Sequence, residues 1–135
     1  MSAEVRFLSI ETAIAINEAM ARRFGGSSGL RDLGLLESAM AQPAQSFGGD
    51  DLYPTISDKA ARYAIGITLD HPFVDGNKRC AAGCMAAFLA INGVAFNPRP
   101  GELADMMFAL ASGEMTPSAF SAWVEDVVGR GESCS

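Results

Sequence analysis

The segment from His71 to Arg79 gathers the residue types that phosphate chemistry requires. His71 is the only histidine of the chain, and imidazole is the side chain best suited to take a proton from an attacking hydroxyl near neutral pH. Asp75 offers a hard oxygen ligand for Mg²⁺, which usually takes only one or two protein carboxylates. Together these residues indicate general-base chemistry beside a phosphate.

Two scarce cations follow in the same segment. Lys78 and Arg79 fall in the first turn of a predicted helix, where the helix dipole is positive and cations are unfavourable. Their placement is reasonable if the helix N-terminus faces an anion, because free N–H groups, the dipole and both cations then converge on it. Gly76 allows close backbone approach to a phosphate, and Asn77 can cap the helix or hydrogen-bond phosphate oxygens.

Each of these residues also has an ordinary structural interpretation. A lone His71 at a helix end is usually a cap or a partly buried surface residue, Asp75 a turn residue, and Lys78 with Arg79 a solvated face. Their conjunction within residues 71–79 favours a phosphate or nucleotide site. It is not a Walker A loop, because no Gly-Lys-Ser or Gly-Lys-Thr occurs, and there is no Gly-x-Gly-x-x-Gly pattern.

Helical periodicity surrounds this segment on both sides. The apolar spacing and the cap residues predict helices over residues 9–24, 31–41, 57–69, 77–91, 102–111 and from 116 onward. The fourth has no charge between Cys80 and Ile91, so it should be central and buried. Phe73 should plug into the core and fix the loop. We therefore expect a compact all-α bundle of about six helices.

One stretch departs from the helical pattern. Phe47 and Tyr53 flank a Gly-Gly-Asp-Asp turn, which predicts a small β-hairpin or ordered flap. A plain connector between helices is the alternative. The earlier run from Gly25 to Gly29 predicts a flexible loop.

Composition bounds the class of protein. The 135 residues, 49% of them hydrophobic, predict one domain over 1–135, with a frayed tail from about residue 129. A net charge of −6 disfavours coating nucleic acid or an anionic membrane, and no apolar run reaches the roughly 18 residues of a spanning helix. The N-terminus lacks signal-peptide features, and three cysteines without framework spacing fit a reducing cytoplasm. Cys80 and Cys84 are expected to be small buried hydrophobes, with a zinc site as the weaker alternative.

The segment His71-Pro72-Phe73-Val74-Asp75-Gly76-Asn77-Lys78-Arg79 resembles the signature loop of the Fic/Doc family. Further likeness to its death-on-curing (Doc) branch lies in Gly29-Leu30-Arg31-Asp32, in Phe47-Gly48-Gly49-Asp50 and in Ala87-Phe88-Leu89 with Asn92-Gly93. The resemblance runs from about residue 29 to residue 96.

Three positions bear on the branch. Family members that transfer AMP carry glycine where this chain has Lys78 and a second arginine where it has Ala82, so both residues are Doc-like. Gly76 is the choice of the wider family, whereas Doc proteins commonly have alanine there. The resemblance to the Doc branch therefore implies a nucleotide that presents its γ-phosphate.

The resemblance implies a role for each residue. His71 would be the general base on the target hydroxyl, Asp75 would hold Mg²⁺, and Gly76, Asn77, Lys78 and Arg79 would bind the phosphates of ATP. Phe47, Gly48 and Tyr53 would form the flap that positions the target peptide.

The resemblance further implies a toxin of a type II toxin–antitoxin pair. It would be a Ser/Thr protein kinase that phosphorylates the translation factor EF-Tu and halts protein synthesis. A protein adenylyltransferase and a catalytically silent module that binds a nucleotide or an antitoxin are the alternatives. Ser121 to Asp126 is a poor match to the family's inhibitory helix, so inhibition is expected in trans, by a helical segment of an antitoxin. No direct binding of nucleic acid or membrane is expected.

Overall fold

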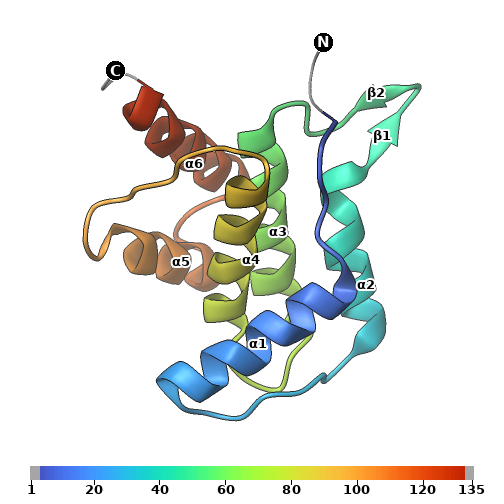
Figure 1. The fold of residues 1–135 in the computed structure, drawn as a ribbon, viewed down its shortest axis with the longest axis vertical. Helices are drawn as coiled ribbons and strands as arrows, with labels where there is room; N and C mark the ends of the chain where they lie inside the picture. The colour runs from blue at the N-terminus through green and yellow to red at the C-terminus, as the bar shows by residue number, and fades with distance from the viewer. Residues whose placement is uncertain (1–3, 133–135) are drawn as a thin grey trace.

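The computed structural model describes residues 4–132, which form six α-helices and one short β-hairpin (Figure 1). The elements in chain order are α1 (Ile10–Phe24), α2 (Leu33–Ala41), a 3₁₀ turn (Gln42–Ala44), β1 (Ser46–Phe47), β2 (Asp50–Asp51), α3 (Ile56–Asp70), α4 (Asn77–Ile91), α5 (Glu102–Ser112) and α6 (Pro117–Glu132). The expected all-α class and the small hairpin are confirmed.

Side-chain caps explain where several helices begin. Ser9 and Thr116 accept hydrogen bonds from backbone N–H groups of the first turns of α1 and α6. Asp32 and Thr55 do the same for α2 and α3. These two caps place the helix starts within two residues of the predicted ones.

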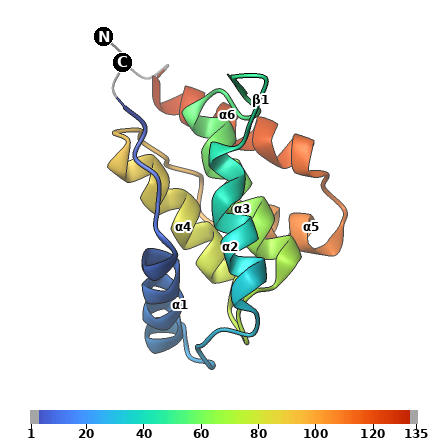
Figure 2. The ribbon, with the colours of Figure 1, turned by 90° about the vertical axis from the view of Figure 1, so that its right-hand side faces the viewer.

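Helices α3 and α4 lie side by side at the centre of the molecule, with α1 and α2 on one side and α5 and α6 on the other (Figures 1 and 2). Tyr63 of α3 and Phe88 of α4 are fully buried, and their ring centroids lie 5.1 Å apart. Burial raises the pKa of Tyr63, whose hydroxyl oxygen accepts a hydrogen bond from the N–H of Leu8. The central helix pair therefore fixes the loop that joins its two members.

The cysteines of α4 behave as core residues. Cys80 and Cys84 are fully buried with their sulfur atoms 4.0 Å apart. Their mutual hydrogen bond and their burial raise the pKa of the Cys80 thiol, which keeps it protonated. No group of three or more potential metal ligands occurs in the described residues.

Helix α6 continues past the point where the sequence predicted a frayed tail. The prediction placed the fray at about residue 129, but α6 is helical to Glu132. Glu102 explains the extension: its carboxylate accepts two hydrogen bonds from Arg130, at 2.8 and 2.9 Å, and one from the indole of Trp123. The rest of the predicted tail lies outside the described residues.

The hairpin stands at the N-terminal end of α3. Ser46 pairs with Asp51 and Phe47 with Asp50, and the turn between them is Gly48-Gly49. Lys59 of α3, only 2% exposed, holds the hairpin by donating hydrogen bonds to the carboxylate of Asp51 and the carbonyl of Tyr53. None of the described helices is long and apolar enough to cross a membrane.

Candidate functional site

The loop between α3 and α4 borders a hollow of about 540 Å³ at one end of the bundle. That volume is within the usual range of small-molecule sites. The hollow is lined by Phe24, Gly25, Gly26, His71, Val74, Asp75, Gly76, Asn77, Lys78 and Arg79. The predicted general base, metal ligand and cations therefore share one cavity.

His71 ends α3 in an unusual backbone conformation. Its φ of 50° and ψ of 56° are left-handed, and it is the only described residue other than glycine with a positive φ. Its N–H donates to the carbonyl of Ile67, which closes the last turn. This turn leaves the exposed His71 side chain beside the hollow.

Gly76 begins α4 and leaves the helix N-terminus open. It is the N-cap residue, its φ is 73°, and no side-chain oxygen accepts a hydrogen bond from the first turn. Lys78 and Arg79 are exposed in that turn. Because unsatisfied N–H groups and two cations meet at one helix end, the site is suited to an anion such as phosphate.

Asp75 faces the same hollow from the loop. Its carboxylate accepts hydrogen bonds from the backbone N–H of Gly76, at 2.8 Å, and of Ser27, at 3.3 Å. The side chain is exposed, so further coordination positions remain accessible. A lone carboxylate beside a phosphate site fits Mg²⁺, which completes its shell with water and substrate phosphate oxygens.

The side chain of Asn77 is hydrogen-bonded within the loop. Its side-chain oxygen accepts a hydrogen bond from the N–H of Phe73 at 3.0 Å, and its amide donates to the carbonyl of Phe73 at 3.1 Å. Phe73 itself is 1% exposed and packs in the core. The Asn77 side chain thus fixes the loop.

The segment from Gly25 to Asp32, predicted as a flexible loop followed by a helix start, is ordered against the signature loop. Leu30 forms a β-bridge with Phe73, and the N–H of Val74 donates to the carbonyl of Gly29 at 2.9 Å. The order comes from these backbone pairs, which glycine content alone does not reveal.

Asn17 of α1 joins the two segments and was not found from the sequence. It is 2% exposed, its amide donates to the carbonyl of Asp75 at 3.0 Å, and its oxygen accepts from the N–H of Gly29 at 3.1 Å. The one sequence signal for this role was that Asn17 is a polar residue at a position of α1 that faces the core.

Phe24 is a second residue that sequence reasoning missed. The guanidinium of Arg79 lies 5.0 Å from the centre of its ring and that of Arg23 lies 5.2 Å away. The contact with Phe24 restrains the Arg79 side chain at the wall of the hollow.

The structure does not bring the hairpin to this site. The hairpin precedes the first residue of α3 and His71 follows its last, so a helix of 15 residues separates them. At 1.5 Å per residue that distance is about 22 Å. Figure 1 shows the hairpin and the start of α4 at opposite ends of the molecule. The geometry therefore argues against the flap role expected for Phe47, Gly48 and Tyr53, and the segment beside the loop is residues 25–32.

A second, mainly apolar groove of about 570 Å³ adjoins the hollow between α1, α4 and α5. It is lined by Met20, Phe24, Lys78, Arg79, Ala82, Gly83, Ala86, Gly101, Leu103, Ala104, Met107 and Phe108. Phe24, Lys78 and Arg79 border both cavities.

Comparisons with known proteins identify a family and two relatives. A sequence model described as the Fic/DOC family matches residues 7–89. A protein named protein kinase doc, from Escherichia phage P1, is 30% identical over 128 residues, which cover 95% of this chain and all of the relative. A protein named toxin Doc, from Mycolicibacterium smegmatis, is 46% identical over 71 residues, which cover 53% of this chain and 55% of the relative.

Proposed function

The chain belongs to the Fic/DOC family, and from that membership we propose that it is the toxin of a type II toxin–antitoxin pair, a kinase that transfers the γ-phosphate of ATP to a Ser or Thr hydroxyl. The observation that carries the proposal is the shared hollow, where His71 lies with the open N-terminus of α4. The target is the translation factor EF-Tu, in the cytoplasm, as the Doc resemblance implies.

The protein's own residues divide the work of the transfer. His71 takes the proton of the target hydroxyl as the hydroxyl oxygen bonds to the γ-phosphorus of ATP. The bond between the γ-phosphorus and the β–γ bridging oxygen breaks, and ADP leaves. The open N-terminus of α4 with Lys78 and Arg79 stabilises the phosphate charge that the transfer redistributes. Asp75 would hold Mg²⁺, and the bound ion would neutralise phosphate charge.

Two observations bear on the direction of the nucleotide. Lys78 adds bulk and charge at the helix end, and Ala82 supplies no second cation one turn later. Both favour a γ-phosphate at this end. Transfer of AMP on the same scaffold is the second candidate, which Gly76 favours.

Inhibition comes from a partner. In α6 the hydroxyl of Ser121 donates to the carboxylate of Asp58, near the end of α3 opposite His71, so this helix is not placed to restrain the hollow. The apolar groove between α1, α4 and α5 is suited to the apolar face of an amphipathic helix from an antitoxin. Ala86→Glu, an exposed change on its wall, should weaken rescue of growth by an antitoxin encoded beside this gene. Equal rescue by the variant would exclude the groove.

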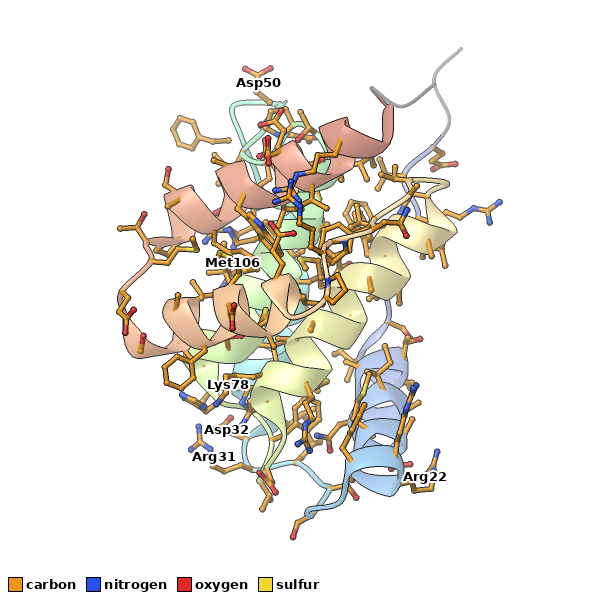
Figure 3. The ribbon with its side chains drawn as sticks, turned by 90° about the vertical axis from the view of Figure 1, so that its left-hand side faces the viewer. Arg22, Arg31, Asp32, Asp50, Lys78 and Met106 are labelled. Atoms are coloured by element: carbon orange, nitrogen blue, oxygen red, sulfur yellow. The ribbon has the colours of Figure 1, made fainter. Side chains whose placement is uncertain are left out.

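Induced expression of wild type and His71→Ala tests the proposal. We expect wild type to arrest growth and His71→Ala to leave growth unaffected at equal protein level. Arg22→Ala, which removes an exposed charge at the same end of the molecule, is the matched control and should remain toxic (Figure 3). If His71→Ala arrests growth as wild type does, catalysis through His71 is refuted and the silent-module alternative gains support.

A further inference from the structure

The Arg31 side chain binds the C-terminal end of α3 at His71, the proposed general base. Its Nε donates to the carbonyl of His71 at 2.7 Å, and a terminal nitrogen of the same guanidinium donates to the carbonyl of Asp70 at 3.0 Å. We propose that Arg31 is a positioning residue that holds His71 in its left-handed conformation for transfer, an inference that rests on the proposed role of His71.

The backbone at His71 needs such a restraint. Residues with a Cβ disfavour the left-handed region, and a residue before proline is biased towards extended geometry. The last carbonyls of a helix also lack partners within the helix. Without the guanidinium the carbonyls of Asp70 and His71 lose this donor, so we expect the peptide after His71 to rotate more readily towards extended geometry and to move the imidazole with it.

Arginine is the side chain that meets this need. Its guanidinium is planar and carries several donors in a rigid fork, so one group can bind two successive carbonyls. Its charge also lies at the negative end of the α3 dipole. A lysine has a single ammonium and can satisfy one carbonyl in good geometry, but not both through a fixed fork.

Arg31 contacts the backbone of His71 and does not line the hollow. It is not among the residues that line the cavity. Its effect on transfer should therefore appear in turnover and not in the binding of nucleotide.

Removing the side chain should leave the fold intact. The backbone N–H groups of Arg31 and Asp32 donate to the carbonyl of Pro72 at 2.8 and 3.0 Å, and Leu30 stays paired with Phe73. These bonds do not involve the guanidinium, so the segment remains attached to the loop in an alanine variant.

The single histidine makes a direct test possible. Protein labelled with ¹³C and ¹⁵N only in histidine gives one backbone signal, that of His71. We expect wild type to show the Cα shift of an ordered left-handed residue, Arg31→Ala to lose it, and Arg31→Lys to be intermediate. Arg22→Ala, the loss of an exposed arginine at the same end of the molecule, should leave the signal unchanged (Figure 3).

Phosphate transfer gives the second readout. In Arg31→Ala we expect kcat to fall about 10- to 100-fold with KM for ATP unchanged, the order of effect that a small misplacement of a catalytic group produces. Partial recovery in Arg31→Lys would support positioning. An unchanged kcat in Arg31→Ala, or a fall explained by KM alone, would overturn it.

The two readouts separate this inference from the proposed function. If the His71 signal of Arg31→Ala equals that of wild type, the positioning role is refuted whatever the activity. If wild type transfers no phosphate but Arg31→Ala loses the left-handed signal, the proposed kinase fails while the restraint on His71 stands.

Discussion

Asn17→Ala should loosen the site and destabilise the whole protein. Asn17 is buried, and its two hydrogen bonds join α1 to the signature loop and to the Gly29 segment. Each such bond contributes about 1 kcal/mol, and groups left partly unsatisfied cost more. We therefore expect the free energy of unfolding to fall by about 2–3 kcal/mol.

Urea unfolding followed by circular dichroism measures this difference, and thermal unfolding gives a second value. An unfolding entropy of about 2.1 cal/mol/K per residue over 135 residues converts 2–3 kcal/mol into a fall in Tm of about 7–11 °C. Glu18→Ala, an exposed neighbour on α1, is the control and should change stability by less than about 0.5 kcal/mol. A loss below about 0.5 kcal/mol in Asn17→Ala would refute the reasoning.

Four further substitutions test other features of the structure. Lys59→Met removes the buried cation that holds the hairpin. Chymotrypsin should then cleave faster after the exposed Phe47, while the helical circular dichroism signal persists. Equal cleavage rates in variant and wild type would contradict the anchoring role. Hydrogen bonds from its arginine partner and from an indole hold the pKa of Glu102 at about 2, so the stabilisation it gives is present above about pH 4.5 and is lost as pH falls towards 2. The difference in Tm between wild type and Glu102→Gln should therefore shrink over that range, and a constant difference would contradict this. Gly76→Ala places a Cβ on a residue with φ 73°, so the free energy of unfolding in urea should fall by about 1–2 kcal/mol. Gly93→Ala, at φ 75°, should lower it by the same amount. An unchanged free energy of unfolding in Gly76→Ala would show that the loop relaxes.

Local signals in the sequence were enough to predict the helices and the position of the signature loop. Apolar period, capping residues and Pro72 determine where α3 ends and α4 begins, because these are short-range effects. The candidate site residues His71, Asp75, Lys78 and Arg79 lie close together in the sequence, and all of them line one hollow.

Contacts between distant segments could not be predicted in this way. Asn17 and Phe24 reach the site through the packing of α1. Arg31 reaches it because the neighbouring Leu30 forms a β-bridge with Phe73. The contact of Arg130 with Glu102 near the end of α6 is of the same kind, because the two residues lie far apart in the sequence.

The hairpin shows the difference between predicting an element and predicting its place. The Gly48-Gly49 turn predicted the strands correctly, because turn chemistry is local. Its distance from His71 depends on the length and direction of α3, which place it at the far end of the helix. Resemblance of a short segment carried no information about that distance.

Transfer of label from ATP tests the central claim most directly. Purified protein is incubated with Mg²⁺ and bacterial lysate containing either γ-labelled or α-labelled ATP, beside His71→Ala. We predict label on one lysate protein, identified as EF-Tu, from γ-labelled ATP only and none with His71→Ala. Label from α-labelled ATP only would contradict the kinase and establish AMP transfer, and equal labelling by His71→Ala would contradict the general base.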